Sequence, residues 1–258
     1  MLTLCQGVGK YVKCLHIALQ DYDTSSSRTR GSHTFYAVTG SGDDGRLLLM
    51  GFARLVRDAL FSMKQLTSYN LSIAQLPRPI ARIIHENKFA TPFLPLDAPF
   101  KLQSFSCMGL SLNAPLVQFL RDQNAITKLD APGLSSRYRL GPPVLPGLRT
   151  ICGTAGLLRR VVPGRPVDSV RCTSPVANVS FFDLVGRLQQ SSCPLKEFIF
   201  PSVFLTAARD YLPILANNFP SLESLVMSDR TPTFLSGTEN MVSVLVKPYR
   251  VQSLIYFS

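Results

Sequence analysis

Tryptophan is absent from this chain of 258 residues, and histidine occurs only three times. His16, His33 and His85 are scattered and form no zinc-like cluster with the six cysteines, which include no CxxC pair. Nor does the sequence bring a nucleophile, a histidine and a carboxylate together as a catalytic triad requires. We therefore predict a protein that is not an enzyme, with no catalytic residue, no cofactor and no metal.

Long hydrophobic runs are absent as well. The longest, at 47–53, is ended by Arg54, whereas a membrane helix needs roughly 20 apolar residues. Residues 1–12 have no basic start, and Gly7, Gly9 and Lys10 interrupt any apolar stretch of a signal peptide. We expect no membrane partner and an intracellular protein, cytoplasmic or nuclear.

Charge of both signs is scarce. Charged residues make up 17% of the chain and hydrophobic residues 46%, which excludes a disordered chain and supports a core. Lys and Arg number 27 against 16 for Asp and Glu, a formal net charge of +11, and Arg159-Arg160 is the only adjacent basic pair. Nucleic-acid binding usually shows a basic stripe, so this diffuse charge favours an acidic protein partner and disfavours nucleic acid.

What the chain does have is a repeated arrangement of apolar residues. An apolar residue, two variable residues, a second apolar residue, one variable residue and a third apolar or small residue recur nine times. The nine stretches are 12–17, 66–71, 102–107, 126–131, 148–153, 167–172, 195–200, 222–227 and 251–256. Each fits a strand whose inward side chains recur while its outward ones vary, as in leucine-rich repeats.

The spacing of these stretches supports a repeat fold. Successive stretches begin 54, 36, 24, 22, 19, 28, 27 and 29 residues apart, mostly near the roughly 20–29 residues of one leucine-rich repeat. The fourth and fifth end on Ala131 and Gly153 and are degenerate. We predict an α/β fold, a leucine-rich-repeat solenoid of the ribonuclease-inhibitor type, with nine strands in one parallel sheet and helices on its convex face.

The segments between the stretches predict helices. Apolar residues recur at intervals of three and four over 47–63, and again after Asn113, which is expected to cap a short helix. A capping box at 180–183 predicts the start of another helix. Further helices are expected at 80–85, from Leu205 to a break or kink at Pro213, and at 234–246.

The segment 21–46 differs from the rest of the chain. Runs of Ser, Thr, Gly and Asp leave it few apolar residues, so it cannot bury much surface. We predict a single leucine-rich-repeat domain over 1–258 with a flexible insertion at 21–46.

The outward positions of the middle stretches are the candidate partner-binding surface, because they line the concave face of a curved solenoid. The charged candidates are Lys128, Asp130, Arg149, Arg171, Lys196 and Glu197. With Asp168 they make a mildly positive, polar face, on which arginine suits carboxylates because its planar fork contacts both oxygens. The alternative is a solvated face whose charges only keep the sheet soluble.

Two other features have competing interpretations. Cys107 and Cys172 fall at inward positions, whereas Cys14 and Cys152 fall at outward ones and are candidates for accessible thiols. Prolines 163 and 166 flank Gly164 and Arg165 just before a stretch. We favour a rigid turn there over a presented arginine, since such residues punctuate turns first.

Several segments carry a resemblance to a known family. They are 11–17, 99–105, 119–129, 145–148, 161–167 and 192–195. In them the chain resembles F-box/leucine-rich-repeat-like proteins of mushroom-forming fungi, over most of its length. The resemblance implies a repeat region that recognises a substrate and no catalytic residues. An F-box often precedes the first repeat in that family and recruits a ubiquitin-ligase scaffold, and we expect no such segment before Leu2.

The predicted function is a non-enzymatic protein-binding module, similar to the substrate-recognition repeat region of an F-box protein in ubiquitin ligation. The alternative is an F-box-independent repeat scaffold that binds an acidic protein or nucleic acid. A ubiquitin-ligase scaffold is expected as a partner only if a longer form contains an F-box. The identity of the protein partner does not follow from the sequence.

Overall fold

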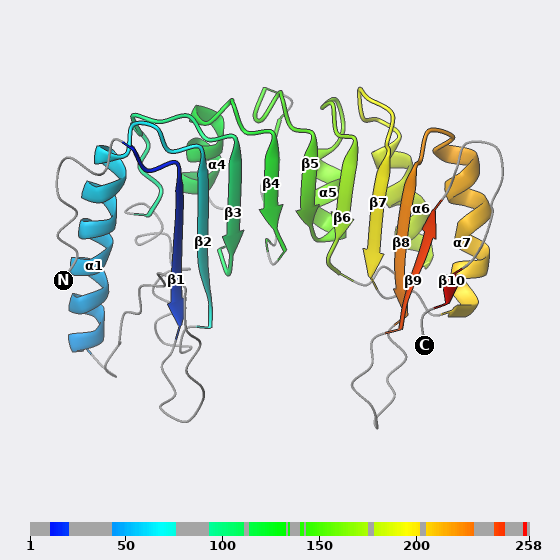
Figure 1. The fold of residues 1–258 in the computed structure, drawn as a ribbon, viewed down its shortest axis with the longest axis horizontal. Coiled ribbons are helices and arrows are strands. Elements are labelled where there is room, and N and C mark those ends of the chain that lie inside the picture. Colours follow the sequence, from blue (N-terminus) through cyan, green and yellow to red (C-terminus); the bar gives the residue numbers. More distant parts are fainter. Residues whose placement is uncertain are drawn as a thin grey trace. The chain divides into compact units, whose positions relative to one another are not determined.

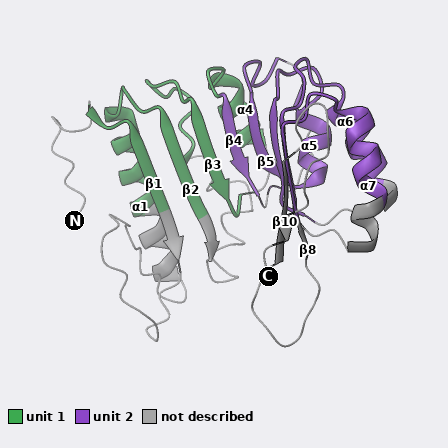
Figure 2. Cartoon of the chain, turned by 45° about the vertical axis from the view of Figure 1, so that its right-hand side comes forward, with its two compact units in different colours: residues 1–126, 136–138 green, residues 127–135, 139–258 purple. Residues whose placement is uncertain are grey.

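A computed structural model describes most of the chain, and Figure 2 shows its two compact units. The described residues are 11–20, 43–75, 93–110, 114–132, 134, 140–141, 143–174, 178–201, 205–229, 240–245 and 255–256. Unit 1 comprises 1–126 and 136–138, and unit 2 comprises 127–135 and 139–258. Each unit alternates strands and helices, so the fold is α/β, as predicted. The prediction of one domain over 1–258 stays a prediction.

Unit 1 contains three parallel strands that pair in chain order. Its elements are β1 (Cys14–Gln20), α1 (Asp43–Ser62), β2 (Ser68–Gln75), β3 (Ser104–Met108) and α4 (Ala114–Asp122). Aromatic rings fill its core. The ring centroid of Phe105 on β3 lies 5.8 Å from that of Tyr69 on the neighbouring β2 and 5.3 Å from that of Phe119 on α4. The predicted helices at 47–63 and after Asn113 are confirmed as α1 and α4.

Unit 2 contains five parallel strands followed by two antiparallel ones. Its elements are β4 (Lys128–Ala131), β5 (Thr150–Gly153), α5 (Ala155–Val161), β6 (Ser169–Cys172), α6 (Asn178–Leu188), β7 (Glu197–Pro201), α7 (Leu205–Asn218), β8 (Ser224–Asp229), β9 (Asn240–Leu245) and β10 (Ile255–Tyr256). Strands β4 to β8 pair in chain order in one constant register (Figure 1). The second apolar positions of the stretches therefore lie side by side across the sheet, from Leu129 to Leu225.

The inward positions predicted from the repeat are buried. This holds for all three positions of the second to eighth stretches, including Cys107 and Cys172. On the same side of the unit 2 sheet, the ring of Phe181 on α6 stacks on that of Tyr211 on α7, with centroids 3.8 Å apart. The Phe181 centroid lies 5.6 Å from that of Phe200 on β7. The helices thus cover the face that carries the inward side chains, and they leave the opposite face of the sheet open (Figure 1).

Packing explains why the last inward position of the fifth stretch is a glycine, Gly153. A side chain at Gly153 would place its Cβ 2.6 Å from a methyl group of Leu157 on α5. Helix α5 follows β5 almost at once, with Thr154 capping it by accepting a hydrogen bond from the Leu157 N–H at 3.3 Å. Because the connection is short, a larger inward residue at this position would have to displace the Leu157 side chain. Helix α5 was not predicted from the sequence.

The prediction of nine parallel strands is wrong at the C-terminal end. Residues 240–245 were expected within a helix but form β9, which runs antiparallel to β8, and β10 pairs antiparallel with β9. The segment Asn240–Leu245 has valines at 242 and 244, and β-branched residues favour a pleated strand. Pairing with β8 satisfies backbone groups that an edge strand leaves open, so the sheet overrides the helical spacing.

Three other helix boundaries differ from prediction. Helix α7 continues through Pro213 to Asn218, with Pro213 itself exposed. Helix α6 begins at Asn178, so Ser180 lies inside it and is not its cap. Helix α1 begins at Asp43, so the last four residues of the predicted 21–46 insertion are helical. The rest of that insertion, the helix at 80–85 and Asn113 lie outside the described residues.

Enlarging Gly153 should destabilise the protein although it restores the repeat. We expect Gly153→Val to lower the free energy of unfolding by about 1–3 kcal/mol, the usual cost of overpacking. The matched control is Cys172→Val at the equivalent inward position of β6, which should change it by less than about 1.5 kcal/mol. Urea unfolding of both variants measures the difference, and equal stabilities would contradict the close approach of Leu157.

Candidate partner-binding face

The open face of unit 2 is defined here as the outward side chains of β4 to β8 and of the residues just before them. The constant register arranges them in three rows across the strands. The leading row is Thr127, Arg149, Asp168, Lys196 and Glu223; the middle row is Lys128, Thr150, Ser169, Glu197 and Ser224; the last row is Asp130, Cys152, Arg171, Ile199 and Val226. The structure thus brings all six predicted charged candidates onto one face, and their binding role stays a prediction.

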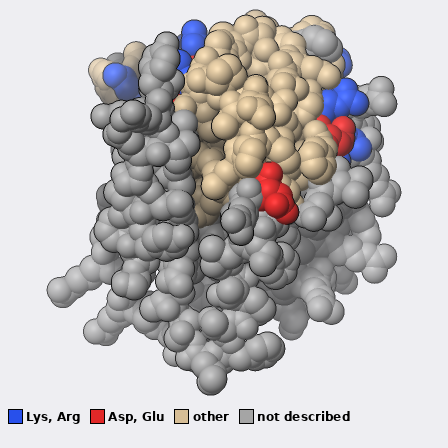
Figure 3. Space-filling model, turned by 90° about the vertical axis from the view of Figure 1, so that its right-hand side faces the viewer, with Lys and Arg blue, Asp and Glu red and all other residues tan. Residues whose placement is uncertain are grey.

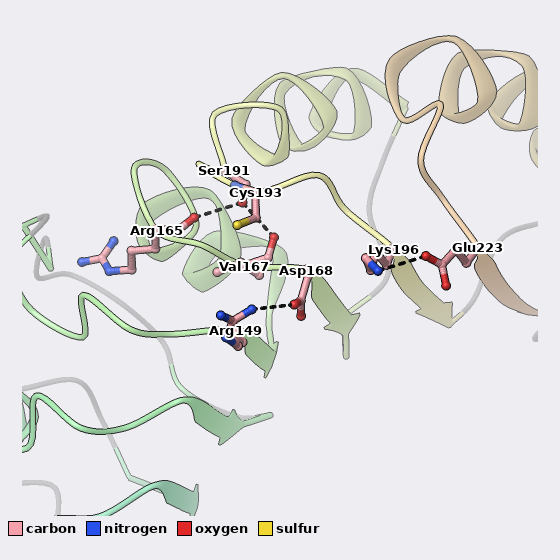
Figure 4. A network of polar contacts seen from close by, with 8 residues as sticks. All are labelled: Arg149, Arg165, Val167, Asp168, Ser191, Cys193, Lys196 and Glu223. Atoms are coloured by element: carbon pink, nitrogen blue, oxygen red, sulfur yellow. Dashed lines mark hydrogen bonds and ion pairs between the residues drawn. The ribbon is translucent and has the colours of Figure 1, made fainter. Parts of the chain in front are cut away.

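Charges alternate along the leading row. Arg149 lies 3.4 Å from the Asp168 carboxylate, and Lys196 lies 3.1 Å from that of Glu223 (Figure 4). Glu223 was not among the candidates predicted from the sequence, because it belongs to the eighth stretch and the candidates were taken from the middle stretches only. Its position immediately after Leu222 was the available signal. With Glu223 included, the three rows contain four cations and four carboxylates.

The three rows carry equal numbers of positive and negative side chains because they include Glu223, which leads into β8; the mildly positive face predicted for the middle stretches alone stays a prediction. Exposed ion pairs such as Arg149–Asp168 contribute at most about 1 kcal/mol, but they do neutralise the cations they contain. Figure 3 shows another side of the molecule with the same feature, since blue and red side chains adjoin at one edge and most of the described surface is uncharged.

Two cations of the open face are left for a partner. Lys128 and Arg171 are exposed, and within the described part of the chain neither forms an ion pair or a hydrogen bond. Between them in the middle row lie Thr150 and Ser169, and the Ser169 hydroxyl donates a 2.6 Å hydrogen bond to Glu197. Glu197 is thereby held on the sheet, and the two free cations remain the groups most able to receive a carboxylate.

Cys152 lies between Asp130 and Arg171 in the last row and is half-buried. Burial, followed by a hydrogen bond to Asp130 and the charge of that carboxylate, raises the pKa of Cys152 to about 12, although Arg171 opposes the shift. A thiol with so high a pKa is almost entirely protonated at neutral pH and is a poor nucleophile. The half-exposed thiol predicted here is present, and it serves as a hydrogen-bond donor.

Arg165, which the sequence allowed as a presented arginine, is 1% exposed. Its Nε donates to the Val144 carbonyl at 2.8 Å, and its two terminal nitrogens donate to further carbonyls. Those carbonyls belong to Leu140, Gly141, Val161 and Pro163. Gly164 supplies the turn with a φ of 74°, a conformation that favours glycine. The turn interpretation is confirmed, and Arg165 is unavailable to a partner.

The backbone around Arg165 is held from the next repeat as well. The Ser191 hydroxyl donates to the Val167 carbonyl at 2.7 Å and lies 3.0 Å from that of Arg165 (Figure 4). Burial lowers the pKa of Arg165, yet arginine stays charged in proteins, so the partners of this positive charge among the described residues are carbonyl dipoles. This arrangement fixes the loops that lead into β5, β6 and β7 relative to one another.

Among the described residues, no three His, Cys, Asp or Glu side chains gather as they would around a metal ion. None of the helices that the structure describes is both long and apolar enough to cross a membrane.

Comparison with known proteins adds no assignment. No family model, no curated protein and no solved structure matches this chain.

The reactivity of Cys152 should follow its neighbours' charges. Asp130→Asn removes the negative charge that helps to raise the pKa of Cys152, so alkylation of this thiol by iodoacetamide at pH 8 should accelerate. Arg171→Ala removes the opposing charge and should slow it. Peptide mass spectrometry that resolves Cys152 measures both rates, and identical rates in the two variants would contradict the arrangement.

Arg165 should be a stability residue. Arg165→Met keeps the apolar stem but leaves several buried carbonyls without donors, so we expect a loss of about 3 kcal/mol or more in the free energy of unfolding. The control Arg187→Ala, on the exposed side of α6, should change it by about 0.5 kcal/mol or less. Chemical denaturation compares the two, and a similar small effect at both positions would show that Arg165 is not needed.

Proposed function

We propose that this chain is a non-enzymatic protein-binding module, a leucine-rich-repeat solenoid of the ribonuclease-inhibitor type that binds through its open face. One observation carries the proposal. Five parallel strands in constant register present three rows of mostly polar outward side chains, while every inward position beneath them is buried. Such a face varies in sequence without disturbing the core, which is how repeat proteins acquire binding specificity.

The chemistry of the face favours an acidic or mixed-charge protein segment. The leading row already pairs its own charges, so it can accept a partner whose charges alternate in the opposite sense. The exposed side chains of Lys128 and Arg171 can pair with carboxylates of a partner, and arginine can bind one with two parallel hydrogen bonds. The overall charge of +11 attracts acidic partners during encounter.

The finer assignment is that this module selects a substrate for ubiquitin ligation. It rests on the resemblance to F-box/leucine-rich-repeat-like proteins, and it requires an F-box in a longer form of the protein. The test is co-purification. The gene product, expressed at full length in its source cell, should bring down a ubiquitin-ligase scaffold together with the partner, and a partner recovered without any scaffold would leave an F-box-independent module.

Changes on the open face should weaken partner binding without affecting folding. The partner is first identified by photocrosslinking from position 128 or 171 in source-cell extract and then purified. We expect Lys128→Ala with Arg171→Ala to weaken its binding at least about tenfold, as loss of charge-assisted contacts does. The melting temperature should stay within about 2 °C, because both side chains are exposed and unpaired.

The matched control is Arg187→Ala, an exposed cation on the helical side of unit 2. Binding to the purified partner should be unchanged. The opposite result, in which Arg187→Ala abolishes binding and the open-face double variant has no effect, would assign the interface to the helices. The proposal would be overturned if the crosslinking recovered no protein partner and the chain instead bound nucleic acid with an affinity that falls steeply as the salt concentration rises.

A further inference from the structure

A pocket of about 440 Å3 lies at the edge of unit 2, apart from the open face. It is bounded by the loop that leads from α6 into β7 and by the loop that leads from α7 into β8. Its lining includes Cys193 and Leu195 from the first loop and Asn218 and Phe219 from the second. The pocket therefore sits where the leading loops of two successive repeats face each other.

The equivalent place in unit 1 shows what such a space can hold. There Gln123, at the end of α4 and 1% exposed, reaches back to the loop before β3. Its side-chain oxygen accepts a hydrogen bond from the Leu102 N–H at 2.8 Å, and its side-chain nitrogen donates to the Phe100 carbonyl at 3.2 Å. One carboxamide thus satisfies a backbone donor and a backbone acceptor two residues apart.

Backbone hydrogen bonds identify Phe219 as the counterpart of Gln123. The Gln123 N–H donates to the carbonyl four residues earlier, and the first apolar residue of the next stretch donates back to the Gln123 carbonyl. Phe219 makes both bonds, with the Leu215 carbonyl at 2.9 Å and the Leu222 N–H at 3.0 Å. Leu102 and Leu195 correspond in the same way, as the first apolar residues of the preceding stretches. Phenylalanine, however, has no polar atom to offer the neighbouring loop.

The groups that a carboxamide would satisfy are left open in unit 2. Among the described residues, the Leu195 N–H and the Cys193 carbonyl have no hydrogen-bond partner, although Leu195 is only 3% exposed. The side-chain amide of Asn218, which also lines the pocket, bonds to other groups. It accepts from Gln189 at 2.6 Å and donates to the Ile214 carbonyl at 2.7 Å. A nearly buried N–H without a partner is costly, so the pocket favours a ligand that supplies one.

We propose that this pocket binds a primary carboxamide, which takes the place that Gln123 fills in unit 1. The ligand oxygen accepts from the Leu195 N–H, and its NH2 group donates to the Cys193 carbonyl. A carboxylate would set one of its oxygens against that carbonyl, and an ammonium group has no acceptor for the N–H. The shared chemistry occurs in a glutamine or asparagine side chain of a partner and in a free small amide.

The test uses backbone amide NMR spectra of the whole chain. N-acetyl-glutamine methylamide is titrated in, with N-acetyl-glutamate methylamide and the methionine analogue as matched controls and propionamide as the free amide. We expect the glutamine probe to shift the Leu195 amide signal and the two controls to leave it in place. Propionamide binding as tightly as the glutamine probe assigns the site to a free amide, whereas clearly weaker binding assigns it to a side chain of a partner.

Two variants connect the shift to the pocket. Phe219→Gln supplies the missing carboxamide from within, so the Leu195 N–H should exchange with deuterium at least about tenfold more slowly and the probe should no longer bind. Gln123→Met, in unit 1, should expose the Leu102 N–H in the same way and make its signal respond to the probe. The second variant leaves unit 2 unaltered, so it keeps the proposal testable if Phe219→Gln does not fold.

Two results would overturn the proposal. One is a Leu195 signal that responds equally to the glutamine, glutamate and methionine probes, which would show a pocket that selects no carboxamide. The other is no response at Leu195 to any probe while the Leu102 signal of Gln123→Met does respond, which would show that the two loops are not equivalent.

Discussion

The buried guanidinium of Arg165 imposes the strictest demand on the described part of unit 2. A charged group removed from water needs an acceptor for each of its N–H groups, and none of the described carboxylates pairs with this one. The loop over 140–144 and the end of α5 meet this demand with backbone carbonyls, which would themselves be costly to bury unpaired. The path of the chain before β5 and β6 thus follows from one side chain.

The same principle recurs with other residues in neighbouring repeats. In unit 1, Gln123 bridges back to the loop before β3, and in unit 2, Ser191 bridges back to the loop before β6. Each is a polar side chain from one leading loop that bonds to the backbone of the preceding one. These bridges tie consecutive leading loops together and help to keep consecutive strands in register. Where Phe219 interrupts the series, a pocket appears.

The constant register of the strands aligns their outward side chains into the open face of unit 2. Because inward positions must stay apolar and buried, a strand shifted by one residue would turn its inward side chains outward, so the register is fixed and the outward residues fall into rows. Residues far apart in the chain, such as Arg149 and Asp168 at 19 positions or Lys196 and Glu223 at 27, become neighbours across strands about 4.8 Å apart. The open face is therefore composed by the fold, and any function it has depends on that alignment.

The inward positions of the second to eighth stretches, the parallel strands and helices α1 and α4 followed from the sequence, because hydrophobic periodicity is a local property of the chain. The ion pair to Glu223, the requirement for Gly153, the burial of Arg165, the unbroken α7 and the antiparallel β9 did not. Each of these depends on atoms that the hydrophobic pattern does not specify, such as the Leu157 side chain beside Gly153 or the strand β8 beside β9. Sequence periodicity decided which side chains point inward; only the tertiary structure decided which polar groups meet, because hydrogen bonds and ion pairs form between residues that are distant in the chain.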